Sequence, residues 1–114
     1  MATIRRSLLG LALAFAGHAS AANFATCILD KLPGTQNDVA AQAIYQVCKS
    51  KHGGLQAVAQ GSGRGLFGYA SGAECTAKKA GETRSNQAAH MIGVACRKLY
   101  DEADWWKKNA TPLN

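Results

Sequence analysis

The chain has 114 residues and a mass of 12.0 kDa, a length that allows one small domain and excludes a multidomain enzyme or a long repeat array. Hydrophobic residues make up 47% and charged residues 18%, which is the composition of a globular rather than a disordered protein. The formal net charge is +6, but no run of five or more basic residues occurs, so nothing in the charge pattern indicates a nucleic-acid partner.

Residues 1–21 have the features of a signal peptide. Arg5 and Arg6 precede an apolar run over 7–17, and small residues follow at 19–21 as in a cleavage site. The run is shorter than the roughly 20 residues that a membrane span needs. We therefore expect a periplasmic or secreted product that begins at Ala22 or Asn23, carries a net charge of +4 and has no membrane span. The alternatives are an uncleaved membrane anchor and a lipoprotein attached through Cys27.

Four cysteines, an even number in a short exported chain, predict a disulfide framework. Cys27 and Cys48 are 21 positions apart, and so are Cys75 and Cys96. When the first segment is shifted by 48 positions, seven of 22 aligned residues are identical, and five of these are not cysteines. The spacing and the identities together predict an internal duplication.

Each copy has the pattern of a helical hairpin, the first over residues 22–52 and the second over 73–104. In the first copy Pro33-Gly34 ends one helix, and Asn37 or Asp38 can cap the next. The predicted apolar side of that second helix consists of Ala40, Ala43, Ile44, Val47 and Cys48.

In the second copy Ser85 or Asn86 can cap the later helix, whose predicted apolar side consists of Ala88, Ala89, Ile92, Ala95, Cys96 and Leu99. The earlier helix has only a weak stripe of Ala73, Ala77 and Ala80, from which Cys75 points away. We expect this helix to be short, or to begin as early as Tyr69.

Four cysteines allow three pairings. A duplicated unit most simply carries its own bridge, which favours Cys27–Cys48 with Cys75–Cys96. Each bridge would contribute about 3 kcal/mol by the chain-entropy estimate. In the first hairpin the two cysteines would lie at heights along the paired helices that differ by roughly 7 Å. They can meet only if the loop at 33–37 folds back. The predicted fold is all-α, with four short helices in two disulfide-stapled hairpins.

A glycine-rich linker at 53–72 joins the copies. Gly63, Gly65 and Gly68 form a GxGxxG pattern, but the strand, helix and acidic residue of a dinucleotide site are missing, so a flexible connector is the better interpretation. We expect Phe67 and Tyr69 to pack against the helices. The alternative is an aromatic patch that contacts a ligand.

The sequence contains few residues in patterns that are typical of an enzyme active site. The two histidines after the leader, His52 and His90, are expected at a helix end and on a helix surface, and no metal-binding or nucleophile motif occurs. Asp101, Glu102 and Asp104 have the pattern of solvated charge at a helix end. We expect no catalytic residues, no metal and no cofactor.

The segment 105–114 begins with Trp105, Trp106, Lys107 and Lys108. One interpretation is that one tryptophan closes the end of the helical core while the other is half exposed. The alternative is a docking edge for a partner protein, a glycan or a membrane surface, since tryptophan and lysine together suit interfaces.

The segment from Cys27 to Cys48 resembles a module in small exported or membrane-tethered bacterial proteins, with the pattern C-I-L-[DE]-x-[LM]-x-G-x-x-[NS]-D-x-A-A-x-x-I-x-x-x-C. In that family a stretch like 65–68, followed by Glu74-Cys75, often leads into a copy. The resemblance supports the same bridge pairing and an exported location, and it implies no activity. The second copy departs from the pattern at Lys78 and Glu82, which places the turn of that copy in question.

These features predict a non-enzymatic binding module of the bacterial envelope, of the inhibitor or immunity kind, whose partner is an envelope protein or a cell-wall component. Its expected contact residues are Trp105, Trp106, Phe67, Tyr69, Lys107 and Lys108. The alternatives are association with the membrane or peptidoglycan through the basic, aromatic tail and a small enzyme that acts on the cell wall.

Overall fold

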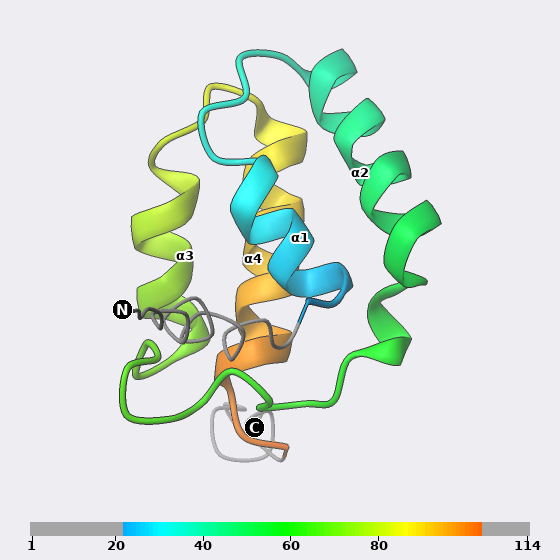
Figure 1. Ribbon diagram of the computed structural model, residues 1–114. Helices are drawn as coiled ribbons and strands as arrows, with labels where there is room; N and C mark the ends of the chain where they lie inside the picture. The colour runs from blue at the N-terminus through cyan, green and yellow to red at the C-terminus, as the bar shows by residue number, and fades with distance from the viewer. Residues whose placement is uncertain (1–21, 104–114) are drawn as a thin grey trace, which may run out of the picture.

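The computed structural model describes residues 22–103, and within this range the chain is helical and has no strand. Figure 1 shows the four α-helices and the short turn that follows the second. In chain order the elements are α1 (Phe24–Lys31), α2 (Asp38–His52), the 3-10 turn η2 (Leu55–Ala57), α3 (Gly72–Ala80) and α4 (Asn86–Tyr100). The predicted fold class is confirmed.

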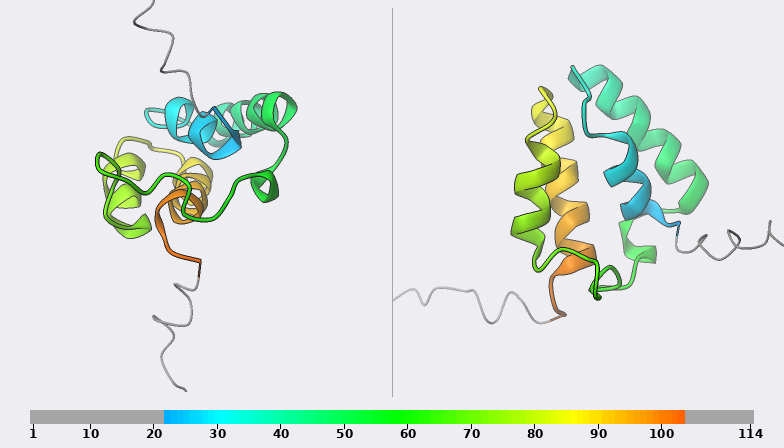
Figure 2. Two further views of the ribbon diagram at one scale, coloured as in Figure 1. Left: turned by 60° about the horizontal axis from the view of Figure 1, so that its bottom comes forward. Right: turned by 60° about the vertical axis from the view of Figure 1, so that its left-hand side comes forward.

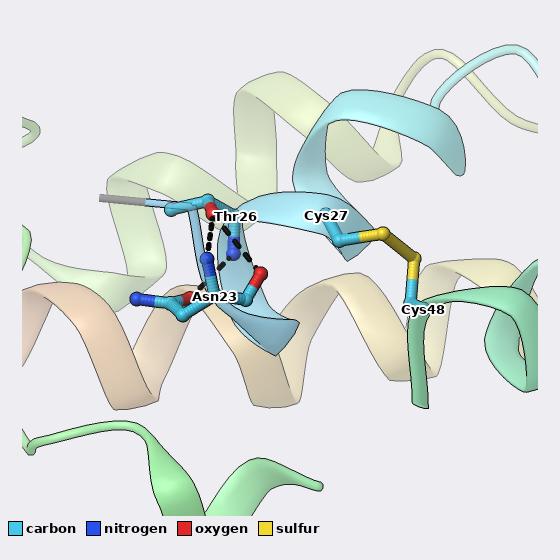
Figure 3. The surroundings of a disulfide bond; sticks show 4 residues. All are labelled: Asn23, Thr26, Cys27 and Cys48. Atoms are coloured by element: carbon cyan, nitrogen blue, oxygen red, sulfur yellow. Dashed lines mark hydrogen bonds between the residues drawn. A yellow bond between two sulfur atoms is a disulfide. The ribbon is translucent and has the colours of Figure 1, made fainter. Parts of the chain in front are cut away.

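Side chains that precede the helices cap their free N–H groups. Asn23 and Thr26 form a capping box at α1, in which each side chain accepts a hydrogen bond from the other residue's backbone N–H at 2.9 Å (Figure 3). Asn37, Ser71 and Ser85 cap α2, α3 and α4, each through a side-chain oxygen that accepts one backbone N–H of the first turn. The caps of α1 and α3 are 48 positions apart, and so are those of α2 and α4, so the helix starts have the period of the sequence repeat.

Each hairpin carries its own disulfide, as predicted. Cys27–Cys48 joins α1 to α2 and Cys75–Cys96 joins α3 to α4, with Cα–Cα distances of 5.7 and 5.6 Å. Figure 3 shows the first bridge spanning the two helices. All four cysteines are buried.

The turn of each hairpin folds back in the same manner. The Thr35 N–H donates to the Leu32 carbonyl at 3.0 Å, and at the equivalent positions the Thr83 N–H donates to the Ala80 carbonyl at 3.4 Å. The second copy therefore keeps the turn although it has Glu82 where the first has glycine.

The two hairpins form two layers, with α1 and α2 in one and α3 and α4 in the other (Figure 2). α4 is the central helix and packs against α1, α2 and α3. Its buried face matches the predicted stripe, with Gly93 in addition and Ala89 only half-buried: Ala88, Ile92, Gly93, Ala95, Cys96 and Leu99.

Two predicted helix faces are wrong in part. On α2, Cys48 is buried and Ile44 packs against the core as predicted, but Ala43 and Val47 are exposed, and Ala41 is buried instead. The disulfide holds Cys48 in the core, and Ala41, seven residues earlier, lies on the same side. On α3, Ala73 and Ala77 of the predicted stripe are exposed and only Ala80 packs against the core, while the buried residues are Gly72 and Cys75. Here too the disulfide orients the helix, with a glycine in the contact.

The two hairpins differ in how closely their helices approach. At Gly72 of α3, an added Cβ would lie 2.8 Å from the Cα of Arg97, so α3 packs directly on the α4 backbone. The equivalent residue of α1 is Phe24, and the residue of α2 equivalent to Gly93 is Tyr45. Phe24 and Tyr45 pack edge to face, with ring centroids 5.5 Å apart. Two rings thus stand between α1 and α2 where the second hairpin has two glycines.

Polar contacts join the hairpin turns at one end of the molecule. The Thr35 carbonyl accepts hydrogen bonds from the Arg84 N–H at 3.1 Å and from the Thr83 hydroxyl. Asp38 in the first turn of α2 accepts from the Ser85 hydroxyl and from the Gln87 N–H at the start of α4. These two hydrogen bonds, that from Ser85 above all, hold the pKa of the Asp38 carboxyl below its usual value.

Candidate functional site

The glycine-rich segment between η2 and α3 forms a loop that is attached to the C-terminal end of α4. The Gly61 N–H donates to the Lys98 carbonyl at 2.7 Å, and the Gly63 N–H donates to the Leu99 carbonyl at 2.8 Å. These carbonyls belong to the last turn of α4, where no intrahelical N–H is available to them. The loop therefore completes the hydrogen bonding of the helix end.

Side chains add to this attachment. The Gln60 side-chain amide donates to the carbonyls of Arg97 and Asp101, both at 2.9 Å, and the Arg64 guanidinium donates to the Tyr100 carbonyl at 2.8 Å. The Gly72 N–H donates to the Asp101 carboxylate at 2.8 Å, which ties the start of α3 to the same end of α4. The linker, which we expected to be a flexible connector, is thus a loop whose two ends are both hydrogen-bonded to the C-terminal end of α4.

Residues 65–68 form the tip of this loop. The Gly68 N–H donates to the Gly65 carbonyl at 3.1 Å, which closes a turn with Leu66 and Phe67 at its centre. An added Cβ at Gly68 would lie 2.4 Å from the Gly63 carbonyl oxygen. The backbone at 63 and the backbone at 68 therefore approach so closely that only glycine fits at position 68. We call this close approach the loop neck, and the turn projects beyond it.

The turn presents two large apolar side chains to solvent. Leu66 is 88% exposed and Phe67 is 97% exposed, the two highest values among the exposed large hydrophobic residues of the described chain. The expectation that Phe67 packs against the helices is wrong, because the turn directs it outward. Tyr69 does pack as expected: its ring meets that of Tyr100 edge to face, with centroids 5.3 Å apart. We call Leu66 and Phe67 the exposed apolar turn.

A wide polar trough lies between α1 and the second hairpin, with a volume of about 510 Å³. Asp30, Lys79 and Glu82 line it together with Tyr69 and Tyr100. Partial burial, and to a lesser extent the neighbouring Tyr69, raises the pKa of the Tyr100 hydroxyl. The trough brings charged groups of both hairpins to one surface, and no histidine, cysteine or serine is among its lining residues.

A second hollow, the apolar pocket, lies between the first hairpin and α4 and has a volume of about 200 Å³. Its lining comes from α1, α2, η2 and α4: Phe24, Ile28, Tyr45, Leu55, His90, Met91, Val94 and Ala95. Ile28 and Ala95 are each 1% exposed, so the pocket reaches the core. His90 is exposed, as expected from its place off the apolar stripe of α4.

Four of the expected contact residues, Trp105, Trp106, Lys107 and Lys108, lie outside the described residues. Within residues 22–103 no group of three or more His, Cys, Asp or Glu side chains could hold a metal ion. Gly63, Gly65 and Gly68 of the GxGxxG pattern serve the loop neck and turn just described, without the strand that a dinucleotide site requires.

Sequence reasoning missed Leu66 and the apolar pocket. A signal for the first was present, because two large apolar residues between glycines at 65 and 68 are typical of a tight turn. For the second there was none, since its lining residues are typical core residues in their helical patterns and come from four separate elements.

No protein-family model matches the chain, and neither a curated protein nor a solved structure matches it.

Two features bear on where the protein works. Both disulfides are formed and no cysteine of the chain is free, which fits an oxidising compartment. None of the helices in the part of the chain that the structure describes is long and apolar enough to cross a membrane.

Proposed function

We propose that this protein is an exported, non-enzymatic binding module of the bacterial envelope, of the inhibitor or immunity kind, and that the exposed apolar turn is its principal contact. The observation that carries the proposal is the exposure of Leu66 and Phe67 on an anchored turn. Neighbouring apolar side chains that are exposed to water often mark a site of protein–protein interaction, and a few residues buried on binding supply most of the energy of an interface.

The anchoring of the turn favours tight binding. A mobile loop loses conformational entropy when it binds, at a cost of about 0.5–1.5 kcal/mol for each side chain that becomes fixed. Here the loop backbone is already held by hydrogen bonds to the end of α4, and the disulfide Cys75–Cys96 holds that helix to α3. The partner therefore needs to order only the Leu66 and Phe67 side chains.

The chemistry of the turn indicates an apolar recess on the partner. Between residues 53 and 73 the only charged side chain is Arg64, and it is engaged with the Tyr100 carbonyl. Recognition at this point thus depends on burial of leucine and phenylalanine side chains, each worth about 1.5–3 kcal/mol when fully buried. An envelope protein with an apolar pocket is the partner that fits.

The test compares capture of envelope proteins by three forms of the oxidised protein: wild type, Leu66→Ser/Phe67→Ser, and Val39→Ser. Val39 is 81% exposed on α2 and provides the control for removal of an exposed apolar side chain. We expect a specific partner to be retained by wild type and Val39→Ser and lost with the turn variant. Affinities measured with the purified partner should then differ by at least tenfold. Equal affinity of all three forms would contradict the proposed contact.

Association with the membrane or peptidoglycan is the second candidate, because a leucine and a phenylalanine that project into solvent can also insert into a lipid surface. Sedimentation with anionic vesicles or with peptidoglycan at low salt tests it. Cosedimentation that is lost in Leu66→Ser/Phe67→Ser or in Trp105→Ala/Trp106→Ala would support surface association. No sedimentation at low salt would exclude it.

A further inference from the structure

The apolar pocket owes its existence to a difference between the two copies. In the second hairpin Gly72 lets α3 lie directly on the α4 backbone, and Gly93 of α4 places no side chain between the helices. In the first hairpin Phe24 and Tyr45 occupy the equivalent positions and keep α2 away from α1. The pocket occupies the space that results between α1, α2 and α4, and Leu55 of η2 also lines it.

The chemistry of this space favours neutral, largely apolar ligands. No Lys, Arg, Asp or Glu lines the pocket, and it reaches the buried aliphatic side chains of Ile28 and Ala95. A charge placed against these two side chains would lose its hydration, and only Tyr45 and His90 of the lining carry polar groups.

The size and the walls of the pocket select among neutral ligands. A volume of about 200 Å³ accommodates one or two fused rings and is too small for a typical drug-sized ligand. Phe24 and Tyr45 contribute ring edges and faces, and Met91 contributes a thioether, which makes favourable contacts with aromatic ring edges. An aromatic ring gains from all three contacts, whereas a saturated ring gains only from burial.

We propose that the apolar pocket is a binding site for a small neutral aromatic molecule of the phenol or indole class. The ring lies between Phe24, Tyr45 and Met91, and a single hydroxyl or N–H group of the ligand faces the Tyr45 and His90 side of the lining. The site is separate from the exposed apolar turn and does not depend on the function proposed for it.

The experiment uses the oxidised protein recovered from the periplasm of an expressing bacterium, with phenol and indole as probes. Binding is followed by chemical-shift changes of side-chain methyl groups. We expect saturable binding with the largest changes at Ile28, Met91 and Val94. Cyclohexanol, which has the size of phenol without its aromatic ring, should bind about 3- to 10-fold more weakly, as expected for aromatic contacts. Benzoate should bind at least tenfold more weakly than phenol because of its charge.

Two variants test the location. Val94→Phe places a ring in the pocket and should weaken phenol binding at least tenfold, whereas Val47→Phe, the same change on an exposed position of α2, should leave it unchanged. Should Val94→Phe not fold, the methyl changes of the wild-type protein still locate the site.

Three results would overturn the proposal. One is the absence of saturable binding at millimolar probe, or changes spread over the surface instead of the pocket. Another is equal affinity for phenol and cyclohexanol, which would show a site without aromatic selectivity. The third is that phenol binds only to a chain that ends at Ala103, or only to a monomeric form of the protein. The pocket of the full chain would then be occupied by the residues after 103 or by a second copy, and not by a small molecule.

Discussion

The close approach of α3 to α4 predicts opposite effects for the same substitution at two glycines. At Gly72, an added Cβ would lie 2.8 Å from the Cα and Cγ of Arg97 and 2.8 Å from the Asp101 carboxylate. Since one of these atoms belongs to the backbone of α4, the helices must move apart. At Gly93, the nearest atoms to an added Cβ are 3.6 Å away, on the Arg97 and Thr76 side chains, which is ordinary van der Waals contact.

The magnitudes follow from packing and from helix propensity. Gly72→Ala overfills a close-packed contact and disturbs the Gly72 hydrogen bond to Asp101, so we expect it to destabilise the protein by about 1–3 kcal/mol. Gly93→Ala fits without overlap in the middle of α4, where alanine is favoured over glycine by about 0.5–1 kcal/mol, so we expect it to stabilise the protein by that amount.

Urea unfolding followed by far-UV circular dichroism, with the disulfides intact, measures both effects. Thermal midpoints should shift by about 4–8 °C for each kcal/mol in a domain of this size. The reasoning is refuted if Gly72→Ala is neutral, or if Gly93→Ala destabilises the protein as much as Gly72→Ala does. The first result would show that Gly72 does not set the distance between α3 and α4, and the second that the contact at Gly93 is as tight as that at Gly72.

Three further predictions concern the first hairpin and the loop. Removal of the first bridge in Cys27→Ala/Cys48→Ala should lower the free energy of unfolding by about 3 kcal/mol. Amide hydrogen-exchange protection should be lost in α2 before the other helices, because α2 has only two buried residues, and unchanged protection of α2 would contradict this. Because the folded-state pKa of Asp38 is lowered, its contribution to stability is complete above its ordinary value of 3.8 and is lost as the pH falls through the lowered value. The difference in urea midpoint between wild type and Asp38→Asn should therefore be larger at pH 6 than at pH 2, and a difference independent of pH would count against the contact. Gly68→Ala should open the loop neck and speed tryptic cleavage inside the loop, whereas Gly65→Ala, where an added Cβ meets nothing within 4 Å, should not; equal cleavage of the two variants would show that the neck does not hold the turn.

Much of the fold was predictable because its signals are local or depend on spacing. Helix starts follow from capping side chains within three residues of the N–H groups they accept from, as at Asn37 and Ser85. The disulfide pairing followed from equal spacing in two similar segments. The stripe of α4 was largely predicted because α4 is surrounded by the other helices, so its apolar pattern and its buried face coincide.

The candidate sites were predictable only in part. Phe67 and Tyr69 are two positions apart in one glycine-rich segment, yet one projects into solvent and the other packs on Tyr100. What separates them is the attachment of the loop to the end of α4, through hydrogen bonds between residues 36 and 37 positions apart, such as that from Arg64 to Tyr100. No local pattern encodes such contacts.

The amino-acid sequence by itself determined the helical class, the duplicated hairpins and the sulfur bridges, since these depend on propensity, capping and spacing along the chain. Only the tertiary structure decided which side of α2 faces inward, where the apolar pocket opens and that Leu66 and Phe67 project together. Side chains of different bulk, glycine in one copy and aromatic in the other, occupy equivalent positions of the two hairpins. Their effect on helix distance exists only once the two helices of each hairpin are packed together.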